Sequence, residues 1–110
     1  MLTKQQIDAL EAEHGEIAHV VGRDYGKGPA WEIVLRRPER KHYKVFRAMA
    51  NHPEKKSDAQ EYLTKQMVVY PPPDKFAALL EENLGLCESD GVSKAITALC
   101  RMESDDSGKE

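Results

Sequence analysis

Residues 31–50 (WEIVLRRPERKHYKVFRAMA) constrain the fold most, because an alternating apolar segment there runs through a proline into a segment of helical spacing. Trp31, Ile33 and Leu35 share one side of an extended chain, which is the period-two pattern of a half-buried strand. Pro38 keeps the preceding residue out of the helical region, and its own φ suits the first turn of a helix. The apolar positions after it are Tyr43, Phe46, Met49 and Ala50. The sequence therefore predicts a strand, a break and a helix whose apolar side folds back on the strand.

A second apolar segment precedes this strand and is predicted to pair with it. Residues 16–23 (EIAHVVGR) are rich in β-branched side chains and indicate a strand. Residues 24–29 (DYGKGP) supply two glycines and a proline, a composition typical of a hairpin loop longer than two residues. We therefore expect an antiparallel hairpin of 16–23 and 30–36, with Val34 on its solvent-facing side.

Capping residues indicate helices on both sides of this hairpin. Thr3 with Gln6, and Ser57 with Gln60, have the spacing of capping boxes. The helices predicted from them cover residues 4–14 and about 58–67. Residues 68–70 (VVY) have a strong β preference but are few, so they indicate either an extended exit or a brief third strand.

The C-terminal half is predicted to contain two more helices. The prolines at 71–73 are expected to form a stiff polyproline spacer. Asp74 is predicted to cap the helix that follows, and Gly85 to end it. A further helix should begin at Ser89 or Asp90. Its apolar stripe comprises Val92, Ala95, Ile96, Leu99 and Cys100.

These elements place the chain in the α+β class, with a small antiparallel β-hairpin packed against four to five helices. At 110 residues the chain is expected to form a single globular domain over residues 1–102. Residues 103–110 (ESDDSGKE) contain no apolar side chain and are predicted to be a disordered acidic tail. The predicted core comprises Ile17, Trp31, Ile33, Leu35, Tyr43, Phe46, Leu63, Met67, Phe76, Leu80, Ile96 and Leu99.

Composition and motifs argue against several classes of function. No apolar run approaches the ~20 residues that span a bilayer, and the N-terminus lacks the features of a signal peptide, so we expect a cytoplasmic protein. Cys87 and Cys100 form no CxxC pair, and the four histidines lack zinc-site spacing, so no metal is predicted. Without a phosphate loop, a dinucleotide fingerprint or a nucleophile signature, we predict neither a cofactor nor an enzymatic activity.

The strongest candidate for binding is a basic segment at 36–47, which carries six basic side chains and one acidic one. The candidate partner-binding residues in it are Arg36, Arg37, Arg40, Lys44 and Arg47. Arg40, Lys44 and Arg47 share one helical face and, together with Lys41, could engage successive phosphates of nucleic acid. A solvated helix face and a site for an acidic protein are the other interpretations. The formal net charge of −3 disfavours nucleic acid.

Two segments resemble a known family. Residues 31–38 (WEIVLRRP), continued by Tyr43 and Phe46, form a strand that ends in an Arg-Pro step and precedes an aromatic-bearing helix. Residues 68–71 (VVYP) and 76–87 (FAALLEENLGLC) place an aliphatic run and a proline before a leucine-rich helix and a Gly-Leu turn. Both segments are similar to parts of the tail assembly chaperones of long-tailed phages and prophages, in particular the short form of their frameshifted pair. Where the family pattern suggests a proline after the Gly-Leu step, this chain has Cys87.

The resemblance covers roughly residues 31–100 and implies a non-enzymatic role. It implies that the chain binds the tail tape-measure protein and the tail-tube protein while a virion tail is assembled. The alternative function is a small nucleic-acid-binding regulator that uses residues 36–47. Because a two-stranded sheet leaves open edges, we also expect a homo-oligomer. Its interface is predicted to use either the stripe of residues 92–99 or the edge of the Trp31 strand.

Overall fold

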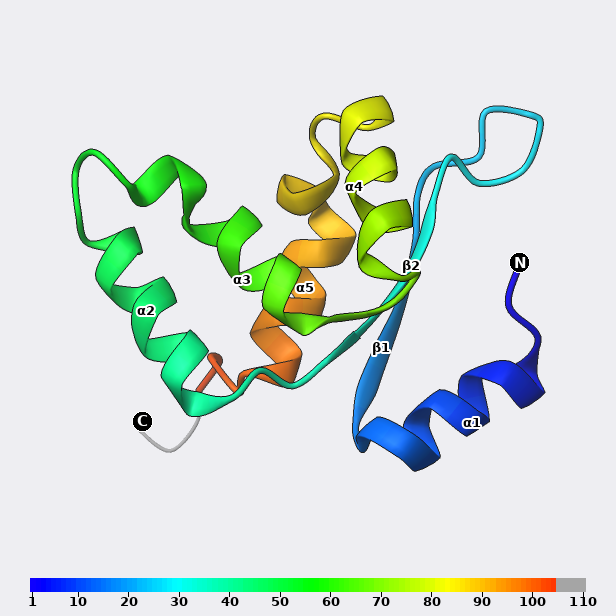
Figure 1. The fold of residues 1–110 in the computed structure, drawn as a ribbon, viewed down its shortest axis with the longest axis horizontal. Coiled ribbons are helices and arrows are strands. Elements are labelled where there is room, and N and C mark those ends of the chain that lie inside the picture. The colour runs from blue at the N-terminus through cyan, green and yellow to red at the C-terminus, as the bar shows by residue number, and fades with distance from the viewer. Residues whose placement is uncertain (105–110) are drawn as a thin grey trace, which may run out of the picture.

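The computed structural model describes residues 1–104 and has the predicted α+β architecture (Figure 1). Its sheet contains β1 (Ile17–Val21), β2 (Glu32–Arg36) and β3 (Val68–Tyr70), with β2 in the centre. The helices are α1 (Lys4–His14), α2 (Arg40–Ala50), α3 (Ala59–Met67), α4 (Pro73–Glu82) and α5 (Asp90–Leu99). Two short 3₁₀ turns, η1 (Lys56–Asp58) and η2 (Leu86–Glu88), precede α3 and α5. The predicted hairpin is therefore extended by a brief third strand, one of the two alternatives that the sequence left open.

The hairpin of β1 and β2 is paired antiparallel over all five residues of each strand. The regular strands are slightly shorter than predicted, but cross-strand backbone hydrogen bonds continue beyond them, from the Gly22 N–H to the Trp31 carbonyl and from the Ala30 N–H to the Arg23 carbonyl. In the loop, Asp24 Oδ1 accepts hydrogen bonds from the N–H groups of Gly26 at 2.7 Å and Gly28 at 3.1 Å. Both glycines have positive φ, at 99° and 94°, which L side chains rarely adopt. The glycines thus close a loop longer than two residues, as predicted.

The central strand β2 is buried on both of its faces, which corrects the expectation that Val34 faces solvent. Ile33, Val34 and Leu35 are all completely buried. Ile33 and Leu35 join the main core, whereas Val34 points the opposite way because successive side chains alternate. Figure 1 shows α1 on one side of the hairpin and the remaining helices on the other. A strand between two layers needs apolar residues at every central position, and EIVLR has them.

Helix α5 fills the core beneath β1. Its stripe of Val92, Ala95, Ile96 and Leu99 is buried, and the helix packs against β1. An ideal Cβ on Gly91 would come within 2.8 Å of Val20 Cγ1, so the start of α5 approaches the strand closely. This contradicts the predicted use of the α5 stripe as an oligomer interface. The Trp31 strand is not an edge strand either, because β2 is paired with β1 over its whole length and with β3 at Val34 and Leu35.

Helix α2 lies at the periphery, although its residues were predicted to be part of the core. It contains no buried residue, and it packs mainly on α3 and η1 at one end of the molecule (Figure 1). Tyr43, Phe46 and Met49 are partly buried and Ala50 is exposed. The confirmed core positions are Ile33, Leu35, Leu63, Met67, Phe76, Ile96 and Leu99, whereas Ile17, Trp31, Tyr43, Phe46 and Leu80 are only partly buried. A helix that rests on one other helix can bury only a narrow side.

One of the two predicted capping boxes is present. Thr3 Oγ1 accepts a hydrogen bond from the Gln6 N–H, and the Gln6 side chain accepts one from the Thr3 N–H. The pair of Ser57 and Gln60 does not form a box, because residues 56–58 make a 3₁₀ turn and Asp58 occupies the N-cap without a side-chain bond. The Gln60 side chain points inward instead and donates to other segments.

The proline run begins a helix rather than forming a spacer. Pro71 is buried and follows a cis peptide bond, Pro72 is the N-cap, and Pro73 is the first residue of α4. Proline is well tolerated at this position because its missing N–H would have no intrahelical partner. Asp74 therefore lies inside the first turn and is not the cap that was predicted.

The predicted acidic tail lies mostly outside the described residues. Glu103 and Ser104 are exposed and belong to no helix or strand, and residues 105–110 are not described. Within residues 1–104, none of the helices combines the length and the apolar character needed to cross a bilayer.

Candidate functional site

The structure distributes the five predicted partner-binding residues along the end of β2, the link that follows it and helix α2. Arg36 ends β2, Arg37 lies in the link to α2, and Arg40, Lys44 and Arg47 project from α2. All except Arg36 are exposed. Among the described residues, none of the five has a carboxylate oxygen within 4.0 Å. The basic surface, defined as these five residues, therefore has positive charge available for a partner.

A cavity of about 250 Å³ lies where the start of α2 meets the end of α5. Two of the predicted residues, Arg37 and Arg40, line it. Its other lining residues are Pro38, Tyr43, Leu99 and Cys100. Lys44 and Arg47 are not among the lining residues, so the structure separates a cavity-lining pair from a pair on the open helix face.

The wall of this cavity is held by a contact between the two ends of the fold. Arg101 has a φ of 56°, and the Met102 N–H bonds to the Thr97 carbonyl, which is a Schellman ending for α5. The Arg101 guanidinium donates to both carboxylate oxygens of Glu16, at 2.9 Å and 3.1 Å. This hydrogen bond lowers the pKa of Glu16 below its usual value. Glu16 is thereby hydrogen-bonded to Arg101, and its charge also interacts with that of Arg37 at longer range, without forming an ion pair with it.

A larger groove of about 420 Å³ lies between α3 and α4, and sequence reasoning did not identify it. Its lining residues are Glu61, Lys65, Val68, Pro73, Phe76, Ala77, Leu80, Glu81, Leu84 and Cys87. Leu84 follows α4 and is 86% exposed, an unusual position for a leucine. The only sequence signal was an apolar residue placed after the end of a helix and before Gly85.

Cys87 lines this groove but is not set up as a nucleophile. Burial raises the pKa of its thiol to about 11, and the nearby Glu61 carboxylate adds to the shift. A thiol with that pKa is protonated at neutral pH, whereas catalytic cysteines depend on the thiolate. The groove is therefore suited to binding rather than to thiol chemistry.

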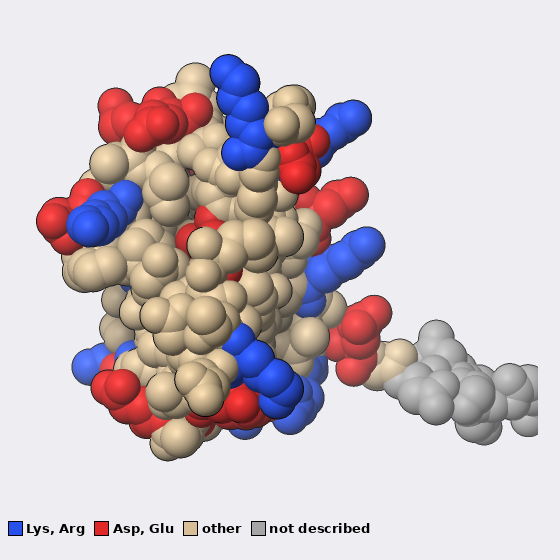
Figure 2. Space-filling view, turned by 90° about the vertical axis from the view of Figure 1, so that its right-hand side faces the viewer, with Lys and Arg blue, Asp and Glu red and all other residues tan. Residues whose placement is uncertain are grey.

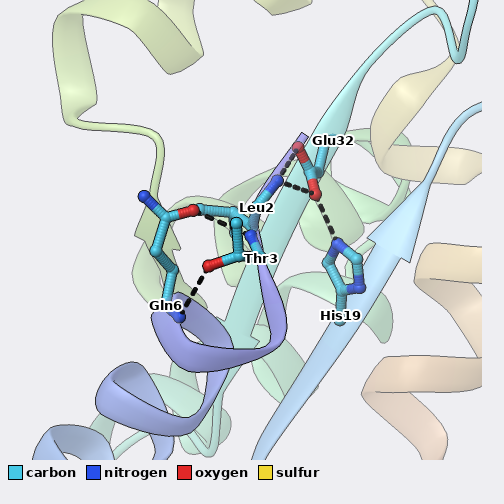
Figure 3. Close-up of polar contacts among 5 residues, drawn as sticks. All are labelled: Leu2, Thr3, Gln6, His19 and Glu32. Carbon is cyan, nitrogen blue, oxygen red and sulfur yellow. Dashed lines mark hydrogen bonds and ion pairs between the residues drawn. The ribbon is translucent and has the colours of Figure 1, made fainter.

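A partly buried carboxylate, that of Glu32, joins the N-terminal segment to the sheet (Figure 3). Both oxygens of Glu32 accept hydrogen bonds from the Leu2 N–H, at 3.1 Å and 3.0 Å, and Glu32 Oε2 lies 2.7 Å from His19 Nε2. Burial alone would raise the pKa of Glu32, but these contacts lower it below the usual value. Because its oxygens are already engaged, we interpret this cluster as an anchor for the N-terminal segment.

The face of the molecule opposite α2 shows mixed charge. Figure 2 shows the face that carries α1 and the hairpin loop, on which acidic and basic side chains surround a broad uncharged area. Helix α2 lies on the other side of the molecule (Figure 1). In the part of the chain that the structure describes, no group of three or more His, Cys, Asp or Glu side chains is placed to hold a metal ion.

Comparison with known proteins supports the fold and no more. No protein-family profile matches the chain, and no curated protein sequence matches it. The chain is similar to a solved structure from Bacillus stearothermophilus, described as the uncharacterised protein rbstp2171, with a TM-score of 0.67 and 19% sequence identity. The match covers 92% of this chain and 97% of the other. At this level of identity, the similarity establishes a shared fold over almost the whole of both chains.

Proposed function

We propose that this protein is a non-enzymatic tail assembly chaperone of a long-tailed phage or prophage that acts in the host cytoplasm. Its clients would be the tail tape-measure protein and the tail-tube protein, as the resemblance of residues 31–100 implies. The observation that carries a protein-binding role is the groove between α3 and α4, which combines an apolar floor with an exposed leucine.

The groove has the chemistry of a site for an amphipathic helix. Ala77 and Leu80 supply accessible apolar surface, while Lys65 and Glu81 provide charge. Helix-in-groove recognition uses a few apolar anchors on one side of the bound helix, with polar contacts around them. Burying an exposed leucine such as Leu84 contributes about 1.5–3 kcal/mol, so a client that covers it would gain affinity.

The basic surface would provide a second contact for a client. Four of its five charges are exposed, Arg36 being partly buried, and no described carboxylate pairs with them. Exposed charges contribute little affinity by themselves but accelerate encounter with a partner of opposite charge. We expect an acidic segment of the client to face α2, and client association to slow as salt increases.

A homo-oligomer remains part of the proposal, but its interface has to differ from the two predicted surfaces. β1 lies at an edge of the sheet and pairs only with β2. Its outer row of backbone groups therefore lacks a strand partner within the described residues, and such edges readily pair with another chain. Light scattering at tens of micromolar protein tests this point, and a strict monomer would rule out stable self-association.

Binding to purified client distinguishes this function from others. The experiment measures the affinity of the full chain for a tape-measure protein from the same gene cluster, using Leu84→Asp as the groove variant. Tyr25→Asp is the matched control, because Tyr25 is also an exposed apolar residue but lies in the hairpin loop. We expect Leu84→Asp to weaken binding at least tenfold and Tyr25→Asp to leave it unchanged. Equal binding by all three proteins would remove the groove from the mechanism, and no binding to any tail component would refute the proposal.

The second candidate is a small nucleic-acid-binding regulator. The observation in its favour is the exposure of Arg40, Lys44 and Arg47 along α2 without described carboxylate partners. Its affinity for duplex DNA should fall with salt at a logarithmic slope of about −0.9 for each phosphate contacted. A gel-shift assay at low salt with micromolar protein tests this function, and an unshifted band would exclude it.

A further inference from the structure

The cavity between α2 and α5 brings together positively charged and hydrogen-bonding groups from separate parts of the chain. Arg37 comes from the link after β2, whereas Arg40 and Tyr43 belong to the first turns of α2. Leu99 and Cys100, from the end of α5, complete the lining. Arg101, which follows them, is fixed to Glu16 by two hydrogen bonds, so this wall is anchored to the start of β1.

The donors around this cavity have no acceptor among the described residues. Neither guanidinium makes a described hydrogen bond or ion pair, and the Tyr43 hydroxyl makes no described hydrogen bond. The neighbouring Glu39 carboxylate lies 3.9 Å from Lys41 Nζ and 3.8 Å from His42 Nδ1, so it is directed toward those side chains. Two cations beside one cavity repel each other, and an anion between them removes that repulsion.

Helix α2 adds to the positive potential. It has eleven residues, and its N-cap makes no side-chain hydrogen bond to the first turn. The N-terminal end of a helix carries partial positive charge and favours anions. The helix end thus adds to the positive potential of the two arginines, which contribute most of the attraction for an anion.

We propose that this cavity is a binding site for a phosphate group, with Arg37 and Arg40 as the charged ligands and Tyr43 as a third donor. Arginine presents N–H groups in a fork that matches phosphate oxygens. Donors on separate segments suit a tetrahedral oxyanion, which offers oxygens in several directions, better than a planar carboxylate. A water occupies roughly 30 Å³ in the liquid, so about 250 Å³ has room for a phosphate group and part of the molecule that carries it.

This proposal is independent of the chaperone function. The groove proposed for a client helix lies between α3 and α4, and it shares no lining residue with the phosphate cavity. Failure to bind a client would not contradict the proposed phosphate site, and failure to bind phosphate would not contradict the proposed groove.

Calorimetric titration of the full chain tests the site. The probes are inorganic phosphate, pyrophosphate, and a short single-stranded oligonucleotide with and without a 5′-phosphate. Arg37→Gln and Arg40→Gln should each weaken binding of the small phosphates roughly tenfold, because each removes a charge-assisted hydrogen bond. Tyr43→Phe should weaken it less. Lys44→Gln and Arg47→Gln are matched controls, since they remove charges from α2 outside the cavity and should leave binding within twofold.

Thermal melts first establish that each variant is folded, which we expect for both arginine variants because Arg37 and Arg40 are exposed. Tighter binding of the 5′-phosphorylated oligonucleotide than of the unphosphorylated one would support the site, provided that Arg40→Gln removes the difference. It would also identify the end of a nucleic acid as the source of the bound phosphate group. No heat with any probe at millimolar concentration would overturn the proposal. So would equal losses in Lys44→Gln and Arg40→Gln, because they would show diffuse attraction to the whole helix.

Discussion

His19 Nε2 lies 2.7 Å from a carboxylate oxygen of Glu32, a contact that joins β1 to β2 beside the N-terminal segment. The Leu2 N–H donates to the same carboxylate, and the net result is a pKa of Glu32 below its ordinary value of 4.5. A carboxyl whose pKa is lower in the folded state binds fewer protons there than in the unfolded chain. Its contribution to stability is therefore complete above pH 4.5 and is lost as the pH falls through the lower, folded-state value.

Glu32→Gln should consequently lower the melting temperature near pH 7, and the difference from the unsubstituted protein should shrink below pH 4.5. Melts recorded by circular dichroism between pH 3 and pH 7 measure this. Glu11→Gln, at an exposed position on α1, is the control for removal of one negative charge. If the difference in melting temperature between Glu32→Gln and the unsubstituted protein stayed constant from pH 3 to pH 7, the lowered pKa of Glu32 would not be its cause.

Gly22→Ala should displace Trp31 from its place at the end of the hairpin. An ideal Cβ on Gly22 would lie 2.5 Å from Trp31 Nε1, which is closer than non-bonded atoms can approach. Because Trp31 is the single tryptophan of the chain, its fluorescence reports the change directly. We expect a red-shifted emission and a lower melting temperature. Gly85→Ala is the control, since open space surrounds Gly85, and an emission spectrum identical to that control would show that the ring is not displaced.

Phe46→Ala should destabilise the fold less than Leu63→Ala does. Phe46 is only partly buried at the edge of the core, whereas Leu63 is completely buried on α3. Truncating a buried leucine costs about 2–5 kcal/mol, and a phenylalanine with one side in solvent should cost about 1–2 kcal/mol. Urea denaturation measures both values. The reverse order would mean that α2 packs more closely than the structure shows, or that Phe46 contacts a second copy.

Gln60→Ala should destabilise the contact of α3 with η2 and α5. Gln60 Nε2 donates to the Cys87 carbonyl at 2.7 Å and to Ser93 Oγ at 2.9 Å. Losing these bonds leaves a partly buried carbonyl without its donor, at a cost of about 1–3 kcal/mol. Gln66→Ala on the same helix is the control, because Gln66 is similarly half-buried but makes no described side-chain hydrogen bond. Equal free energies of unfolding for the two variants would show that the Gln60 bonds contribute little.

Local patterns in the sequence predicted the elements well. Alternation around Ile33 and the restraint at Pro38 place β2 and α2 correctly, because both are properties of neighbouring residues. Val34 was misplaced because period-two alternation cannot show whether a second layer covers the other face. That depends on α1, which is separated from β2 in the sequence and packs beside β1. Similarly, the apolar stripe of α2 shows which side is covered but not how completely.

The candidate sites were harder to predict from the sequence than the helices and strands were. The exposed arginines and lysine were predicted because charged residues on a helix face normally remain in solvent. The pairing of Arg37 with Cys100 around one cavity, and the groove that includes Leu84, depend on how distant helices pack. Gln60 illustrates the same limit, since its spacing from Ser57 suggested a cap while its partners lie 27 and 33 residues away.

The packing of α5 against β1, together with the bond between Arg101 and Glu16, affects when the protein can fold during its synthesis. The ribosome makes β1 early, but α5, which covers the inward side chain of Val20, is made about seventy residues later. A nascent chain that has not yet emerged through Cys100 must therefore leave that apolar surface uncovered. Chains interrupted before this point should be aggregation-prone and easily degraded, so quality control during translation would detect them readily.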